Sequence, residues 1–254
     1  MKEQRFFYCP DIACGQLPED EARHALRVLR LGEGDELWLM DGVGRFHQAV
    51  ITVATGHRCF FQIQDTITPE REWDGTIHLA MAPTKNMDRT EWLAEKATEI
   101  GIDRLTFLDC QFSERHVVKS ERIDKILIAA MKQSHKAWKP ALDEMTAFRR
   151  FVTRPDLPPF RFIAHCYDMA DVGGGDKPFL LDALTDMLQT TPAQHTSAYP
   201  EMLVLVGPEG DFSIDEVKRA HEAGFRSVSL GKSRLRTETA ALAAVHLMHL
   251  IRKN

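Results

Sequence analysis

The sequence predicts an α/β protein that carries a smaller β domain at its N-terminus. From residue 76 onward, short apolar runs alternate with helical segments, which is typical of a parallel sheet covered on both faces. Hairpin signals dominate the part before it, and the polar run 68–72 has the composition of a linker. We therefore predict one domain in residues 1–72 and a second in residues 73–254.

The N-terminal domain is expected to be a small, mostly antiparallel β-barrel with one helix. Residues 36–40 and 46–53 flank a turn at 41–44, and apolar residues alternate with polar ones at 59–63, as in a strand with one buried face. Pro18 and the three acidic residues after it predict the start of a helix.

Arginines recur on one face of that helix. Arg23, Arg27 and Arg30 follow an i, i+4, i+7 spacing, which predicts a basic stripe. A solvated helix face explains such a stripe as well as a contact with RNA phosphates does, so the spacing alone leaves both open.

The C-terminal domain is expected to contain strands at 77–82, 105–108, 162–164, 202–206 and 228–230. Residues 88–91 resemble a capping box that opens a helix ending at Gly101, and residues 122–136 form a basic helix. Ser213 begins a further helix that stops at Gly224.

The last helix is apolar almost all round. Between residues 240 and 251 only His246 and His249 are polar, so burial on both sides is expected, and a second copy of the chain supplies the simplest cover. We therefore predict a homodimer. The two histidines lack a carboxylate or cysteine partner, which favours interface residues over metal ligands, and no metal is predicted.

Composition narrows the class of protein. The apolar stretches are shorter than a membrane-spanning helix needs, and the N-terminus lacks the pattern of a signal peptide, so a cytoplasmic protein without a membrane partner is expected. Five cysteines without C-x-x-C spacing favour free thiols. The net charge of −5 argues against a protein that holds nucleic acid by bulk positive charge.

Two glycine-containing loops follow the strands at 202–206 and 228–230. Ligands in open α/β sheets bind beyond the carboxyl ends of the strands, where both loops are expected. Pro208 removes a backbone donor and Glu209 repels phosphate, and the chain has no phosphate-binding glycine motif. A partly apolar ligand without phosphate suits these loops, and a nucleoside sulfonium is such a ligand.

The same loops carry a family resemblance. Residues 206–210 (Val-Gly-Pro-Glu-Gly), Leu230-Gly231 and residues 235–240 (Leu-Arg-Thr-Glu-Thr-Ala) resemble the signature of the RsmE family of 16S rRNA (uracil-N3) methyltransferases in the SPOUT superfamily. Residues 24–31, 96–101 and 113–115 resemble further blocks of that family. Asp211 stands where the family more often has a second glycine.

The resemblance implies S-adenosylmethionine bound in a trefoil-knotted C-terminal domain, a PUA-like RNA-binding barrel, and a dimer. It also implies methylation of N3 of a specific uridine in 16S rRNA; with the acidic net charge, this points to a small-subunit particle as substrate. The expected cofactor contacts are Leu205, Val206, Gly207, Glu209, Gly210, Leu230, Gly231, Leu235, Arg236, Thr237 and Ala240. The expected RNA contacts are Arg5, Arg23, Arg27, Arg30, Lys85, Arg89 and Arg115.

Two residues are candidates for catalysis. Uracil N3 becomes a nucleophile when its proton leaves, and Arg236 suits the anion that forms on O2 and O4. Glu238 is a candidate base, but a structural role as a cap at the start of the final helix is at least as consistent with its position. A water molecule or solvent hydroxide could then accept the N3 proton. The alternative functions are ribose 2′-O methylation by another SPOUT enzyme and a noncatalytic RNA-binding dimer.

Overall fold

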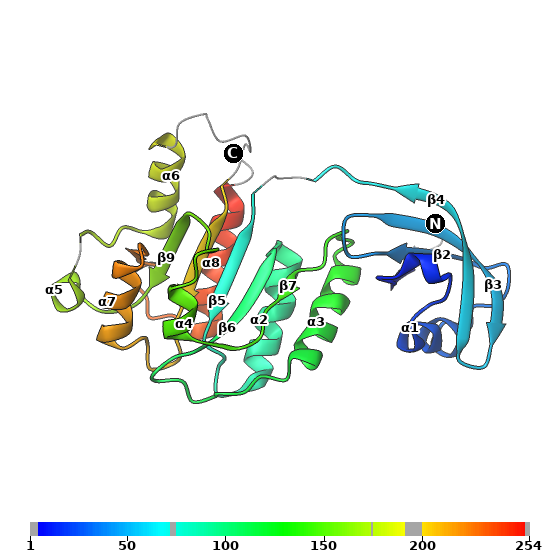
Figure 1. The fold of residues 1–254 in the computed structure, drawn as a ribbon, viewed down its shortest axis with the longest axis horizontal. Coiled ribbons are helices and arrows are strands. Elements are labelled where there is room, and N and C mark those ends of the chain that lie inside the picture. The colour runs from blue at the N-terminus through cyan, green and yellow to red at the C-terminus, as the bar shows by residue number, and fades with distance from the viewer. Residues whose placement is uncertain (1–4, 72–74, 174, 191–199, 252–254) are drawn as a thin grey trace. The chain divides into compact units, whose positions relative to one another are not determined.

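The computed structural model describes residues 5–71, 75–173, 175–190 and 200–251. The chain divides into two compact units (Figure 1). The first contains residues 1–72 and also residues 128–139, whereas the sequence assigned the latter stretch to the C-terminal domain. The second contains residues 73–127 and 140–254.

The first unit is built on a four-stranded sheet in the order β1-β2-β3-β4. The strands are β1 (Phe6–Tyr8), β2 (Glu36–Met40), β3 (Phe46–Thr55) and β4 (Arg58–Ile67). β1 pairs with β2 in parallel, and the other neighbours are antiparallel. Within the described residues no ladder joins β1 to β4. Residues 15–17 pair with β4 instead, since Leu17 N donates to Cys59 O and Phe61 N donates to Gly15 O, and the helix that follows them also contacts β4.

That helix differs from the predicted one. α1 (Glu19–Arg23) continues into the π-helical turn η2 (His24–Val28), and Arg30 lies beyond it with a φ of 55°. A π turn changes the spacing of side chains around the axis, so the regular basic stripe is wrong. A short 3-10 turn, η1 (Ile12–Cys14), precedes the helix.

The second unit is built on a sheet in the order β11-β9-β10-β5-β6-β7, with β8 also paired to β6, and every described ladder in it is parallel. This confirms the predicted mostly parallel α/β sheet. The strands are β5 (Ile77–Met81), β6 (Arg104–Asp109), β7 (Ala141–Leu142), β8 (Thr146–Ala147), β9 (Phe160–Ala164), β10 (Met202–Val206) and β11 (Arg226–Val228).

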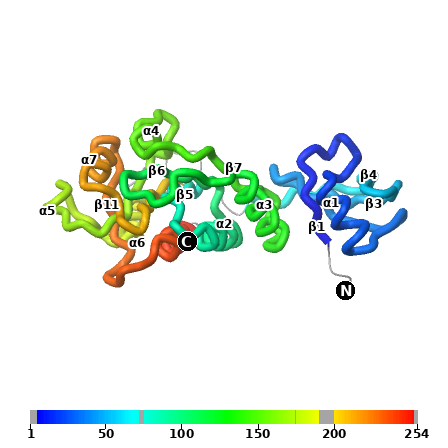
Figure 2. The backbone as a smooth tube through the Cα atoms, turned by 90° about the horizontal axis from the view of Figure 1, so that it is seen from below, coloured from blue at the N-terminus to red at the C-terminus, as the bar shows by residue number. Residues whose placement is uncertain are grey.

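Helices cover both faces of this sheet. They are α2 (Met87–Ile100), α3 (Ser120–Gln133), α4 (Phe148–Val152), α5 (Met169–Val172), α6 (Leu180–Thr190), α7 (Ile214–Glu222) and α8 (Thr237–Ile251). α4 and α7 lie on one face, and α2 and α8 on the other (Figure 2). Val204 of β10 packs with α2 and α8, while Leu205 packs with α4 and α7, so alternate side chains serve the two cores.

Local signals fix the helix starts near the carboxyl ends of the strands. The capping box of α7 is confirmed: the Ser213 hydroxyl accepts from Glu216 N, and the Glu216 carboxylate accepts from Ser213 N. α2 begins earlier than predicted, because the Asn86 side chain accepts from Asp88 N and thereby caps the helix.

The two sides of the final helix differ in burial within this chain. His249 and Met248 are buried, but His246 is exposed and Leu250 is 38% exposed, so this chain alone covers only one side. The continuous apolar pattern did not reveal which side the sheet covers. Among the described residues, no helix combines the length and the apolar character needed to cross a membrane.

Candidate functional site

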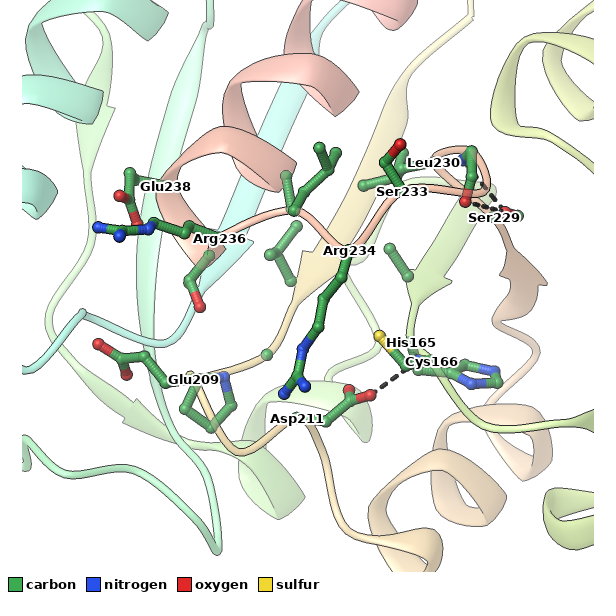
Figure 3. Close-up of a pocket in the computed structure, with 18 of the residues that line it drawn as sticks. His165, Cys166, Glu209, Asp211, Ser229, Leu230, Ser233, Arg234, Arg236 and Glu238 are labelled. Carbon is green, nitrogen blue, oxygen red and sulfur yellow. Dashed lines mark hydrogen bonds between the residues drawn. The ribbon is translucent and has the colours of Figure 1, made fainter.

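A cavity of about 900 Å³ lies where β9, β10 and β11 end (Figure 3). Its walls come from the loop after β10 (206–211), the segment between β11 and α8 (229–238) and the end of β9 (164–167). The carboxyl ends of three adjacent parallel strands therefore meet at one site, as open α/β sheets predict.

The Gly-Pro-Glu-Gly turn is fixed by close contacts. A Cβ on Gly207 would lie 3.0 Å from Phe212 N, and a Cβ on Gly210 would lie 3.1 Å from the Cβ of Phe112. Glu209 accepts a hydrogen bond from the backbone N–H of Lys85 at 2.9 Å, which ties the turn to the segment after β5. The shape of this wall thus depends on two glycines and one carboxylate.

Asp211 links two walls of the cavity. Its φ is 67°, in the left-handed region that glycine adopts most easily, so the usual glycine at this place and the aspartate satisfy the same backbone requirement. Its carboxylate accepts from Cys166 N at 2.7 Å and from Phe212 N at 2.8 Å. Arg234 extends toward this carboxylate (Figure 3).

The segment between β11 and α8 leaves much of its backbone unsatisfied. Gly231 has a φ of 117° and donates to the Ser229 hydroxyl at 3.2 Å, and Arg236 O accepts from Ala240 N at the start of α8. In the described part of the chain, the backbone N–H groups from residues 232 to 235 have no hydrogen-bonded partner. These donors are available to a ligand.

Two titratable side chains stand at the start of α8. Arg236 is exposed, whereas Glu238 is only 8% exposed, and both line the cavity. The Oε1 of Glu238 lies 3.7 Å from Nε of Arg89 on α2, so this carboxylate already joins two helices electrostatically.

Most of the residues predicted to contact the cofactor come together at this cavity. Val206, Gly207, Glu209, Gly210, Leu230, Gly231, Leu235, Arg236, Thr237 and Ala240 line it. Leu205 does not line it, because its side chain is fully buried in the core beneath α7.

Sequence reasoning missed the wall formed after β9. His165, Cys166, Tyr167 and Lys177 line the cavity, and Lys177 Nζ donates to Tyr167 O at 2.5 Å. Burial, together with the nearby ammonium of Lys177, lowers the pKa of His165 to about 4. The predicted strand at 162–164 was the available signal, because its end belongs to the same edge of the sheet as the two glycine loops.

The predicted RNA contacts are divided between the two units. Arg5, Arg23, Arg27 and Arg30 belong to the first unit, and Lys85, Arg89 and Arg115 belong to the second. Several have local partners: Arg23 pairs with Glu19, Arg27 contacts His57 and Arg115 donates to Lys85 O. No group of three or more His, Cys, Asp or Glu side chains suited to a metal occurs among the described residues.

Comparison with known proteins agrees with this site. A family model described as an RNA methyltransferase domain matches residues 71–249, and one described as an RNA methyltransferase PUA domain matches residues 17–64. Ribosomal RNA small subunit methyltransferase E of Mycobacterium bovis is 30% identical over 239 residues, covering 89% of this chain and 82% of the relative. The chain belongs to the RsmE family.

Solved structures show the same family relationship. A probable rRNA-methyltransferase from Porphyromonas gingivalis is 39% identical, with a TM-score of 0.83 and 98% of each chain covered. An RsmE family member from Neisseria gonorrhoeae, solved bound to S-adenosyl methionine, is 28% identical, with a TM-score of 0.74 and 98% of each chain covered. The resemblance in the sequence is thereby confirmed, together with the RNA methyltransferase activity and the PUA-like N-terminal domain of the family.

Proposed function

We propose that this protein transfers a methyl group from S-adenosylmethionine to N3 of one uridine in 16S rRNA, in the cytoplasm and on a small-subunit particle. One observation carries the proposal: both glycine-containing loops of the RsmE signature line a single cavity at the carboxyl ends of β10 and β11. The relative from Neisseria gonorrhoeae with bound cofactor supports the identity of the donor.

The residues of the cavity fit S-adenosylmethionine. Its volume of about 900 Å³ is near the upper end of small-molecule sites, which hold roughly 300–1,000 Å³. Val206, Leu230 and Leu235 offer apolar walls for the nucleoside, and the unpaired backbone donors of residues 232–235 suit its polar edges. When bound, this cofactor supplies a methyl group activated by a sulfonium.

Arg236 is proposed as the residue that stabilises the reacting base. Uracil N3 would receive the methyl group as the sulfonium becomes a neutral thioether, and N3 becomes a nucleophile for that transfer when its proton leaves to a base. The resulting negative charge on the base spreads to O2 and O4, where a fixed guanidinium is stabilising. Arg236 is exposed at the wall of the cavity and carries no ion pair among the described residues.

Glu238 is proposed to accept the N3 proton or to hold Arg89 in place. Its ion pair with Arg89 supports the second role, because the pair joins the start of α8 to α2. Glu238→Gln separates the two: a positioning role predicts a change in the apparent substrate affinity, and a base predicts loss of turnover with an altered pH profile.

The second-unit cations are proposed to hold RNA near the cavity. Lys85 is 74% exposed at its side chain, and Arg89 is 40% exposed. The arginines of the first unit are proposed to contact the RNA backbone from the PUA-like domain. Such contacts position RNA without reading its sequence, which agrees with a structured particle as substrate.

A homodimer and a trefoil knot complete the proposal. The uncovered side of α8 presents Leu250 with the half-buried Leu242 and Leu247, an apolar strip that a second copy of the chain would bury. The knot is proposed from the resemblance of the two signature loops to those of the RsmE family.

Cofactor binding tests this proposal directly. Leu230→Asp puts a charge into an apolar wall of the cavity, whereas Val117→Asp makes the same change at a side chain 74% exposed outside it. We expect calorimetry to show that the first variant loses S-adenosylmethionine and the second binds like the wild type. Equal binding of S-adenosylmethionine by both variants, or no binding by the wild type, would refute the proposed cofactor site.

A further inference from the structure

A second, shallow recess of about 310 Å³ adjoins the main cavity. It is formed by Asp88, Arg89 and Trp92 of α2 together with Glu238 and Thr239 of α8. Arg89 and Glu238 line both hollows, so the recess and the cavity share a wall. The recess is at the lower end of ligand-site volumes, which suits a single nucleobase rather than a whole nucleoside sulfonium.

Trp92 gives this recess an aromatic surface. Its neighbours Leu93 and Ala94 are buried in the core, but Trp92 is 44% exposed. Single-stranded RNA bases are commonly recognised by stacking on exposed aromatic side chains. A partly exposed indole beside a methyltransferase cavity therefore offers a stacking platform.

The charge of the recess favours a neutral base over a phosphate. Asp88 and Glu238 contribute two carboxylates, and Arg89 contributes one cation. A phosphate at this place would meet net negative charge, so Arg89 is better placed to contact a neutral base, and Lys85 and Arg115 are left as the second-unit residues that contact the RNA backbone.

The polar groups match the edge of uracil. Uracil presents O2 and O4 as acceptors on either side of the N3–H donor, while the recess offers the Arg89 guanidinium and the Thr239 hydroxyl as donors and Glu238 as an acceptor. Cytosine has a lone pair at N3, so a carboxylate facing that atom repels it. The long Arg89–Glu238 separation of 3.7 Å leaves both groups able to take further partners.

We propose that this recess holds the uracil that is methylated, stacked on Trp92, with its N3 edge at the wall shared with the main cavity. The inference rests on the proposed function and adds the place of the target base and the groups that select uracil. It assigns Trp92, Arg89 and Thr239 to substrate binding.

Trp92→Ala tests the platform, with Trp92→Phe as the conservative variant and Val117→Ala as a control at another exposed apolar side chain. Val117 is 74% exposed and lines neither the recess nor the cavity. Loss of one stacked base predicts a roughly 5- to 150-fold fall in kcat/KM on unmodified small subunits. We expect Trp92→Phe to recover most of it, and we expect the kcat/KM of Val117→Ala and all affinities for S-adenosylmethionine to stay unchanged.

Uridine quenching of tryptophan fluorescence gives a readout independent of turnover. We expect quenching in the wild type, its loss in Trp92→Phe, and a weaker effect of cytidine. If Trp92→Ala has wild-type kinetics, the recess is not the binding site of the target base, and the proposed function stays intact. A Trp92→Ala defect accompanied by a changed oligomeric state would overturn it in favour of a protein contact, and a wild type that forms no 3-methyluridine would remove both proposals.

Discussion

Asp211 allows the cost of a left-handed backbone to be separated from the hydrogen bonds that it makes possible. Asp211→Ala and Asp211→Gly both delete the carboxylate that accepts from Cys166 N and Phe212 N, and so lose the same two hydrogen bonds. Only alanine keeps a Cβ at a φ of 67°. This strain is about 1–2 kcal/mol, so Asp211→Ala should be less stable than Asp211→Gly by that amount.

Urea unfolding measures this difference. We expect the urea concentration at the midpoint of unfolding to decrease from wild type to Asp211→Asn, then Asp211→Gly, then Asp211→Ala, with the m-value constant. Asparagine stands second because it tolerates the left-handed region and its amide oxygen still accepts a hydrogen bond. Equal midpoints for the alanine and glycine variants would refute the strain, and a glycine variant as stable as the wild type would show that the two hydrogen bonds contribute nothing net.

Two further predictions concern stability. Ser213→Ala removes the cap of α7 and should lower the free energy of unfolding by about 1 kcal/mol, with Ser213→Thr as the control; an unchanged value would contradict the capping role. The pKa of His165 is about 4 in the folded protein, below the ordinary histidine value of 6.5, so the unfolded state binds more protons between these two pH values. The wild type should therefore lose stability as pH falls from about 6.5 toward 4, by at most about 1.4 kcal/mol per pH unit from this group, and the loss should be smaller in His165→Asn. Parallel pH slopes of urea stability for the two proteins would contradict this burial effect.

The central strands and the signature loops were predictable from sequence for a physical reason. β10 is buried on both faces, so it reads as an uninterrupted apolar run, and the loop that follows it is placed by the rule for open α/β sheets. The cap at Ser213 is a local interaction, complete within four residues, and it too was visible in the sequence.

Features that depend on distant parts of the chain were not predictable. The π turn after α1 interrupts a spacing that looked regular, and Arg30 ends outside the helix. Residues 128–139 group with the first unit because of contacts that no local pattern encodes. The role of Asp211 as a link to Cys166 likewise joins residues 45 positions apart.

The recess beside Trp92 shows the same limit. Its side chains come from α2 and α8, which are remote in sequence but pack together. The charged residues one turn away on either side, Asp88, Arg89, Glu95 and Lys96, place Trp92 on the polar face of α2, but helical spacing does not show that α8 packs beside that face. The assignment of a substrate role to Trp92 therefore had to wait for the structure.

Transfer of a labelled methyl group from S-adenosylmethionine to small subunits that lack modifications tests the central claim most directly. Nucleoside digestion should recover the label as 3-methyluridine. Arg236→Ala should reduce the rate at saturating S-adenosylmethionine about 100- to 1,000-fold, with folding retained. Label on ribose, no label despite bound cofactor, or full activity of Arg236→Ala would contradict the account.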